Sequence, residues 1–118
     1  MINNTETVTS SVKVGDIYQM SWGYDQTNVN FFQVTRLSKA GIFIREIASK
    51  GVEGTDGFMC NKVVAVPGAF LDRSQWCGGY NDKNPETFRK CNGNGFSIRG
   101  RYYASRWDGQ PTYCSWYA

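Results

Sequence analysis

Short runs of alternating apolar and polar side chains organise the first half of the chain, and their two-residue period is that of a β-strand. The clearest runs are 17–22, 29–37 and 42–47, and only SKAG at 38–41 separates the last two. A connection of that length that contains glycine is typical of a β-hairpin. In the second run neither face is wholly polar, so we expect a sheet that is buried on one side and partly covered on the other. The pattern predicts an antiparallel meander of three strands.

The rest of the chain has a less regular pattern. Residues 48–58 are rich in glycine and are expected to form a loop, and Pro67 is expected to end a fourth strand because proline has no amide donor. We expect at most a short helical turn around residues 70–76, and Gly100 predicts a bulge or a break. The other expected elements are a strand at 60–68 and a hairpin in which NGNG at 92–95 joins a strand at 87–91 to a strand-like run at 96–107. A turn at 108–111 and a final strand at 113–118 follow.

These elements predict a single, mostly β domain at residues 12–118 behind a polar N-terminal tail at residues 1–11. Roughly five to seven short strands with closely spaced turn signals are typical of a small antiparallel barrel or a bent sheet. The lead-in VKVGDIY at 12–18 is of a kind that SH3-like barrels often use, so an SH3-like barrel is a specific expectation. The positions expected in the core are Ile17, Val34, Leu37, Ile42, Ile44 and Val64.

Length and composition fit this picture. The 118 residues suffice for one domain with one hydrophobic core, and 13 glycines with 15% aromatic residues favour sheet over helical bundle. No apolar run reaches the length of a transmembrane helix, and the tail MINNTETVTSS has no basic residue and no apolar core. We therefore expect no membrane association, no secretory signal and a cytoplasmic location.

The net charge of +3 is unevenly distributed along the chain. Residues 1–59 carry five basic and six acidic side chains, whereas residues 60–118 carry eight basic and four acidic ones. No acidic residue interrupts the five positive charges Arg89, Lys90, Arg99, Arg101 and Arg106. Such a bias can mark a surface that faces phosphate groups, and it can equally be a sheet edge that carries solvated charges against aggregation.

The four cysteines, Cys60, Cys77, Cys91 and Cys114, are widely spaced, and the chain contains no histidine. A structural zinc site normally uses closely paired ligands, so no metal site is expected. Without an export signal the expected compartment is reducing, which predicts four free thiols.

Residues suited to catalysis are few. The usual general base near neutral pH is absent because there is no histidine, and no nucleophile motif or phosphate-binding loop is present. Asp25 and Asp108 each follow an aromatic residue and could form a carboxylate pair if their loops met. The simpler interpretation is that each caps its own turn through a hydrogen bond to the backbone. We expect no catalytic residues, no cofactor and no enzymatic activity.

Aromatic side chains beside polar and basic ones are the strongest indication of binding. In SWGYDQTNVNFF at 21–32, turn chemistry accounts for Asp25 and Asn28 but leaves Gln26 and Thr27 without a structural role. Near the C-terminus, aromatic residues alternate with arginines, a combination that grips single-stranded nucleic acid and also forms protein hot spots. An unbroken strand would place Arg99, Arg101 and Tyr103 on one face. The candidate binding residues are Trp22, Tyr24, Gln26, Thr27, Arg99, Arg101, Tyr103, Arg106 and Trp107.

The segments WGYDQTN (22–28), FFQVTR (31–36) and RWDGQPTYCSWYA (106–118) resemble a family of small uncharacterised proteins encoded by bacteriophages, plasmids and other mobile elements. The resemblance covers residues 13–48 and 97–118, and the middle of the chain shares no motif with the family. It implies a phage-like genetic setting and an intracellular site of action, and it assigns no role to any residue.

Three functions are compatible with these observations. The preferred one is a non-enzymatic binding module that occludes a surface on a host protein or nucleoprotein complex, in the manner of anti-CRISPR or anti-restriction proteins. The second is direct binding of nucleic acid through the basic and aromatic residues. The third is a small enzyme or carbohydrate binder that uses Asp25 or Asp108. A steep loss of affinity with rising salt would favour the second over the first.

Overall fold

The computed structural model describes residues 12–23, 27–52, 60–78, 83–91, 94–98, 100 and 102–115, and this part of the chain forms β-strands and no helix. The strands are β1 (Ile17–Trp22), β2 (Asn28–Leu37), β3 (Ile42–Gly51), β4 (Cys60–Phe70), β5 (Thr87–Arg89), β6 (Gly95–Ile98), β7 (Tyr102–Arg106) and β8 (Thr112–Ser115). The mostly β prediction is confirmed. No helix long and apolar enough to cross a membrane occurs in the described ranges.

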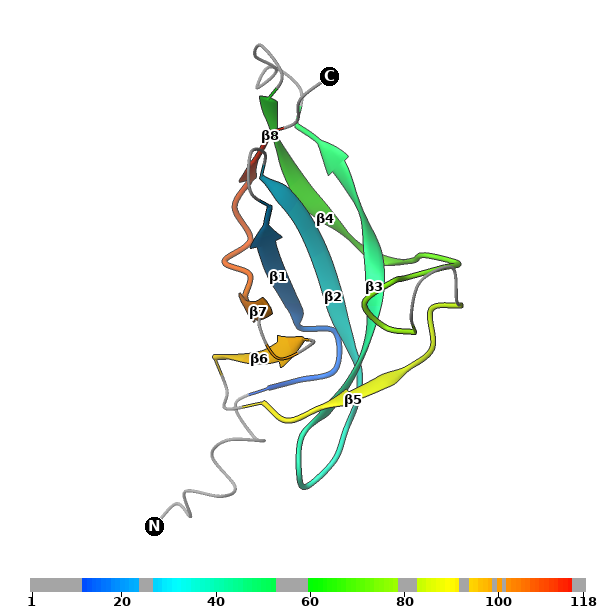
Figure 1. The fold of residues 1–118 in the computed structure, drawn as a ribbon. Helices are drawn as coiled ribbons and strands as arrows, with labels where there is room; N and C mark the ends of the chain where they lie inside the picture. Colours follow the sequence, from blue (N-terminus) through cyan, green and yellow to red (C-terminus); the bar gives the residue numbers. More distant parts are fainter. Residues whose placement is uncertain are drawn as a thin grey trace.

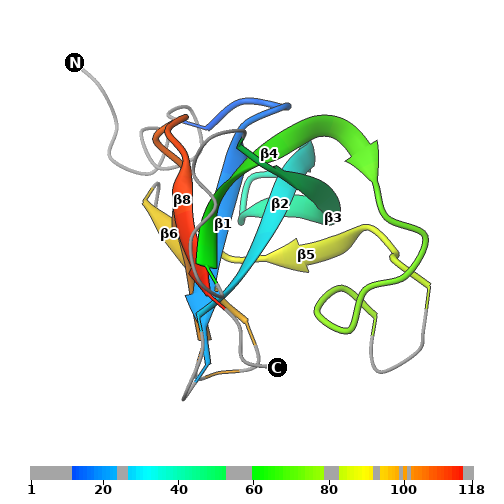
Figure 2. The same ribbon diagram turned by 90° about the horizontal axis from the view of Figure 1, so that it is seen from above.

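The eight strands form one antiparallel sheet (Figure 1). Seven of them follow the order β6-β7-β1-β2-β3-β4-β8, and β5 lies off this path. β5 lies beside the first part of β3, where it pairs with residues 42–44, and β4 pairs with the later part. The sheet bends so that β8 returns towards β1, as the view from above shows (Figure 2), and the Thr112 hydroxyl donates to Gln19 Oε1 at 2.6 Å. β6 and β8 do not pair with each other, so the expected bent sheet is formed but does not close into a barrel.

The predicted meander is confirmed as β1, β2 and β3, and it contains one irregularity. The register of β2 against β3 shifts between Val34 and Arg36, which makes Thr35 an extra residue on β2. The bulge reverses the alternation, so Leu37 lies on the same side of the sheet as Val34 and packs against the same cluster.

Two expectations need correction: residues 48–51 of the expected loop at 48–58 belong to a strand, with 53–58 outside the described residues, and the fourth strand does not end at Pro67. β3 continues to Gly51, and β4 continues past Pro67 to Phe70. Ile47 pairs with Phe70 and Ser49 with Ala65, so the residues between Ala65 and Phe70 form a wide bulge outside the ladder. Within this bulge Pro67 needs no hydrogen-bonding partner for its nitrogen, and Gly68 adopts a φ of 79°.

The expectation of at most a short helical turn around 70–76 is confirmed, since no helix forms there and the Ser74 hydroxyl accepts hydrogen bonds from the amides of Trp76 and Cys77 at the start of a turn at 75–78. The expected hairpin that follows needs correction. β5 does not form a hairpin with the following strand but pairs with β3. The hairpin partner of β6 is β7, and the expected break at Gly100 (φ 74°) is their connection.

The sheet buries side chains on both faces. β2 supplies both cores, since Phe31 and Phe32 are each fully buried and point to opposite sides. The large cluster contains Val12, Tyr18, Met20, Phe32, Val34, Ile42, Ile44, Trp76, Cys77, Cys91, Phe96, Ile98 and Ala104. The small cluster contains Phe31, Ile47, Val63 and Ala65.

Most of the predicted core positions are confirmed. Val34, Ile42 and Ile44 are buried, and Ile17 and Leu37 are partly buried against the clusters. Val64 is the exception: it is only partly buried and belongs to neither cluster, because its neighbours Val63 and Ala65 are the residues that point inward.

Candidate binding surface

The two tryptophans among the predicted binding residues have structural contacts. Trp22 packs edge-on against Trp76 with ring centroids 5.4 Å apart, and its indole nitrogen donates to Asn30 Oδ1 at 2.6 Å. Trp107 packs against Phe31 at 5.4 Å. Both rings therefore form walls of the two clusters, and their contacts explain their presence without a ligand.

Arg106 is also tied to the fold. Its guanidinium forms an ion pair with Asp16 at 3.0 Å and lies 5.6 Å from the ring centre of Tyr18. Thr27 is partly buried just before β2. Tyr24, Gln26, Arg99 and Arg101 lie outside the described residues. Because β6 ends at Ile98 and β7 begins at Tyr102, the unbroken strand that would align Arg99, Arg101 and Tyr103 is not formed.

The turn interpretation of Asp108 is confirmed, since its Oδ1 accepts a hydrogen bond from the amide of Gln110 at 2.9 Å. The indole of Trp107 closes the same turn by donating to the Gln110 carbonyl at 2.8 Å. Asp25, the other member of the hypothetical carboxylate pair, lies outside the described residues.

Tyr103 is a predicted binding residue that the structure leaves accessible. It faces outward on β7 with 49% of its surface exposed. A Cβ placed on Gly95 of the neighbouring strand would lie 2.7 Å from the Tyr103 ring, so the ring lies directly over this glycine. Any larger residue at 95 would clash with the Ala104 carbonyl of β7 as well as with the ring.

An open pocket of about 430 Å³ lies beside Tyr103, and we call it the β6 pocket. Ala40, Lys90, Ser97 and Tyr103 are exposed and form its rim, whereas Cys91, Gly95 and Phe96 are buried. Its volume falls in the range of small-ligand pockets, and its lining combines an aromatic ring, apolar surface and one cation.

Cys91 and Phe96, two of the buried residues that line the β6 pocket, belong to the large cluster. The Cys91 thiol shares a hydrogen bond of 3.5 Å with the Tyr18 hydroxyl, and the Tyr18 ring packs 5.2 Å from Phe96. Burial and this hydrogen bond raise the pKa of Tyr18 above its ordinary value, so the phenol stays neutral. Sequence reasoning found Tyr103 but not the pocket, because its rim comes from three segments that are far apart in the chain.

A buried polar cluster lies at the other end of the large core. Glu46 is only 6% exposed and accepts hydrogen bonds from the Ser74 hydroxyl at 2.5 Å and the Asn30 amide at 2.7 Å. Burial is the largest influence on Glu46 and raises its pKa. Asn84 donates to the carbonyls of Glu46 and Leu71, and its side-chain oxygen accepts from the Glu46 amide.

This cluster is unsuited to nucleophilic catalysis. The Ser74 hydroxyl is engaged as a donor to Glu46 and as an acceptor from two amides. Burial raises the pKa of the nearby Cys77 thiol to about 11, which keeps it protonated at neutral pH. This cluster could not be predicted from local patterns, because Glu46 and its partners Ser74 and Asn84 come from separate segments.

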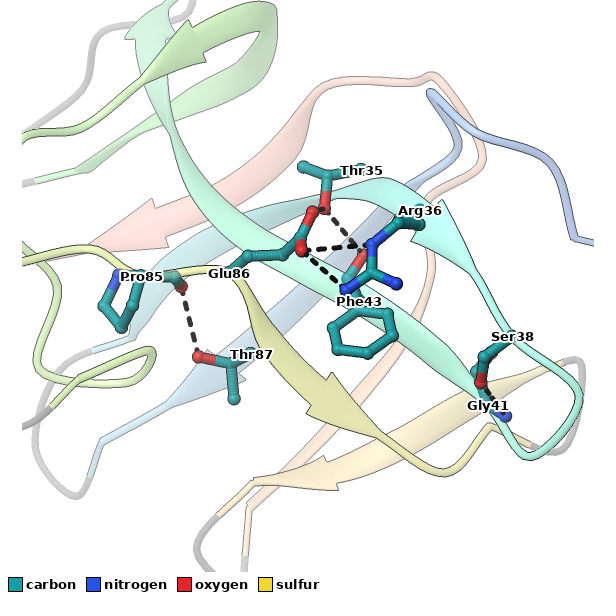
Figure 3. A network of polar contacts seen from close by, with 8 residues as sticks. All are labelled: Thr35, Arg36, Ser38, Gly41, Phe43, Pro85, Glu86 and Thr87. Carbon is teal, nitrogen blue, oxygen red and sulfur yellow. Dashed lines mark hydrogen bonds and ion pairs between the residues drawn. The ribbon is translucent and has the colours of Figure 1, made fainter.

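A second polar cluster connects Glu86, which precedes β5, to two residues of β2 (Figure 3). The Thr35 hydroxyl donates to Glu86 at 2.6 Å, and the Arg36 guanidinium forms an ion pair with the same carboxylate at 3.1 Å. Arg36 also lies 3.8 Å above the ring centre of Phe43, which packs against Phe88 of β5. The hydrogen bond from Thr35, followed by the contact with Arg36, lowers the pKa of Glu86.

Comparison of the chain with protein-family models, curated proteins and solved structures finds no match. Among the described residues no three cysteine, aspartate or glutamate side chains are grouped so that they could hold a metal ion. Within these residues the β6 pocket combines an exposed aromatic ring, apolar surface and a cation, which makes it a candidate binding site.

Proposed function

We propose that the protein is a non-enzymatic binding module of a phage or mobile element that occludes a surface on a host protein or nucleoprotein complex. The β6 pocket is the observation that carries the proposal, because it joins an exposed tyrosine to a lysine beside an open apolar depression. Tyrosine is among the residues that dominate protein hot spots, and a rigid ring loses little entropy on binding. The genetic setting and the bacterial cytoplasm rest on the resemblance of the segments at 22–28 and 106–118.

Two further features support binding over catalysis. In the buried cluster the Ser74 hydroxyl and the Glu46 carboxylate are joined by a hydrogen bond. Burial keeps the Cys77 thiol protonated. Asp108 is used in its own turn. An inhibitor that acts by occlusion needs a stable surface and no reactive group, in the way that anti-CRISPR and anti-restriction proteins block a defence complex.

The test is capture of a host partner by tagged protein expressed in bacteria, with and without nuclease treatment. We expect a protein partner that survives nuclease and is lost with the double variant Tyr103→Ala and Lys90→Glu. The matched control is Tyr113→Ala with Lys50→Glu, which changes an equally exposed tyrosine (53%) on β8 and an exposed lysine on β3. Equal loss with both double variants, or no captured protein, would contradict the proposal.

Direct binding of nucleic acid is the alternative, and the ion pair of Arg106 with Asp16 weighs against it. One cation of the basic run is thereby neutralised within the fold. A protein that neutralises several phosphates loses affinity steeply with salt. Binding to a single-stranded oligonucleotide that falls in this way, with no captured protein partner, would favour the alternative.

A further inference from the structure

β6 is an end strand of the sheet, and its main chain has one side that β7 does not use. The Arg106 amide donates to the Asn94 carbonyl at 2.9 Å, which makes these two residues a hydrogen-bonded pair of the ladder. Antiparallel ladders alternate between hydrogen-bonded and non-hydrogen-bonded pairs, so Phe96 and Ile98 direct their main-chain groups towards β7. Ser97, which is opposite Tyr103, therefore directs its amide and carbonyl away from β7.

The β6 pocket lies at this same strand. Ser97 belongs to its rim, and its exposed side chain shares the outer face of the hairpin with Tyr103. Lys90 lies on the rim as well and comes from the segment that follows β5. An extended chain that paired with Ser97 would thus pass a pocket of about 430 Å³ and a cation.

We propose that β6 accepts an extended acidic peptide segment of a partner protein as an added strand, with one bulky side chain in the β6 pocket and a carboxylate beside Lys90. In such strand addition the main-chain hydrogen bonds give affinity, and the pockets for alternate side chains give specificity. This inference rests on the proposed function, because it specifies the chemistry of the partner that the same surface binds.

The charges around β6 select this occupant. Lys90 lies at the pocket, and the nearby Arg106 and Asp16 neutralise each other in an ion pair, which leaves Lys90 as the charge that the pocket presents. No acidic residue occurs between Arg89 and Arg106. Two copies of this edge would bring like charges together, which opposes self-pairing, whereas an acidic strand would meet opposite charge.

The experiment is a titration of ¹⁵N-labelled protein followed by NMR, with two short synthetic peptides as probes. One peptide alternates glutamate with phenylalanine, and the other alternates lysine with phenylalanine. We expect the glutamate peptide to shift the amides of Lys90, Cys91, Ser97 and Tyr103, with the Ser97 amide moving downfield as it gains a hydrogen bond. The lysine peptide should leave these amides unchanged.

Two variants separate the two parts of the proposal. Ser97→Pro removes the outward amide while leaving the bonds to β7, since proline is tolerated at a sheet edge where its nitrogen faces solvent. Lys90→Glu reverses the selecting charge. Each should weaken binding of the glutamate peptide by about tenfold, because one variant removes a charge-assisted contact and the other a main-chain hydrogen bond. Lys50→Glu, on the exposed part of β3, is the control and should have no effect.

The inference is overturned if the glutamate peptide shifts none of these amides at millimolar concentration, or if the lysine peptide shifts them equally. It is also overturned if correctly folded Lys90→Glu protein binds normally, if a ten-nucleotide oligothymidylate competes better than the glutamate peptide, or if the protein dimerises through β6. Capture of a host partner that depends on Tyr103, with no response to the peptide, would reject strand addition and leave the proposed function intact.

Discussion

Glu46 occupies the least favourable environment of the described carboxylates, because it is almost fully buried beside an apolar cluster. Burial raises its pKa in the folded protein, whereas the unfolded chain titrates near 4.5. The folded state therefore holds the proton more tightly, and the contribution of Glu46 to stability is greatest below pH 4.5 and is lost as pH rises through the folded pKa. We predict that Glu46→Gln removes this decline, so the thermal midpoint of the variant gains on the native one as pH rises above 4.5.

Glu86 supplies the control, because its pKa is lowered. Its contribution to stability is present above pH 4.5 and is lost as pH falls through the folded pKa, so Glu86→Gln should change the pH profile in the opposite direction. Parallel profiles for the two variants would show that the burial of Glu46 does not control its titration.

Asn84 supplies a partner to the buried Glu46 amide and to the Leu71 carbonyl, whereas the Glu46 carbonyl also accepts a hydrogen bond from the Leu71 amide at 3.1 Å. Its side chain bonds the amide and carbonyl of Glu46 and the carbonyl of Leu71. We predict that Asn84→Ala lowers the free energy of unfolding by about 2–4 kcal/mol, because each orphaned buried group costs about 1–3 kcal/mol and water partly restores the exposed one. Urea unfolding measures this loss. Gln110→Ala, at an exposed side chain, should stay within about 0.5 kcal/mol, and similar losses for both variants would contradict the assignment.

At the level of elements, β5 has three residues and depends on contacts outside its ladder. Glu86 links it to Thr35 and Arg36 of β2 across the intervening β3. We predict that Glu86→Gln accelerates amide hydrogen exchange in β5 by about two- to fivefold, the range expected for an exposed ion pair, while exchange in β1 and β2 stays unchanged. Uniform acceleration in all strands would mean that the contact stabilises the whole protein rather than β5.

The sequence predicts elements well where the alternation is regular and the connection short. β1, β2 and β3 satisfy both conditions, since SKAG at 38–41 leaves little freedom in how the last two pair. The passage of β4 through Pro67 could not be predicted, because it depends on a bulge whose register is set by β3. The pairing of β5 with β3 joins residues more than forty positions apart, and local pattern carries no information on such contacts.

The same limit applies to the candidate site. Exposed Tyr103 follows from strand alternation, which sends it to the opposite face from Tyr102. The lining by Ala40 and Lys90 depends on how the turn between β2 and β3 and the end of β5 come to lie near β6. The packing of Trp22 against the large cluster could not be predicted either, because its partner Trp76 lies in a segment without a regular pattern.

For the whole molecule, the decisive feature is that one sheet supports both cores. Phe31 and Phe32 are neighbours on β2, yet they belong to different clusters. Loss of β2 would therefore expose both cores at once. This arrangement makes a separate unfolding of the small cluster unfavourable, although that cluster has only four buried residues.

We predict a single cooperative unfolding transition, and the tryptophans provide a reporter for each core. Trp76 belongs to the large cluster, Trp22 packs against it, and Trp107 packs against the small cluster. Their indole NMR signals should disappear with the same midpoint in a urea titration. Phe31→Ala should lower the midpoints of all three signals together, with a loss of about 3–5 kcal/mol, because a buried aromatic side chain is truncated in the sheet that both cores share. If Trp107 instead reported an earlier transition than Trp22, or if Phe31→Ala shifted Trp107 alone, the two cores would be independent folding units despite their common strand.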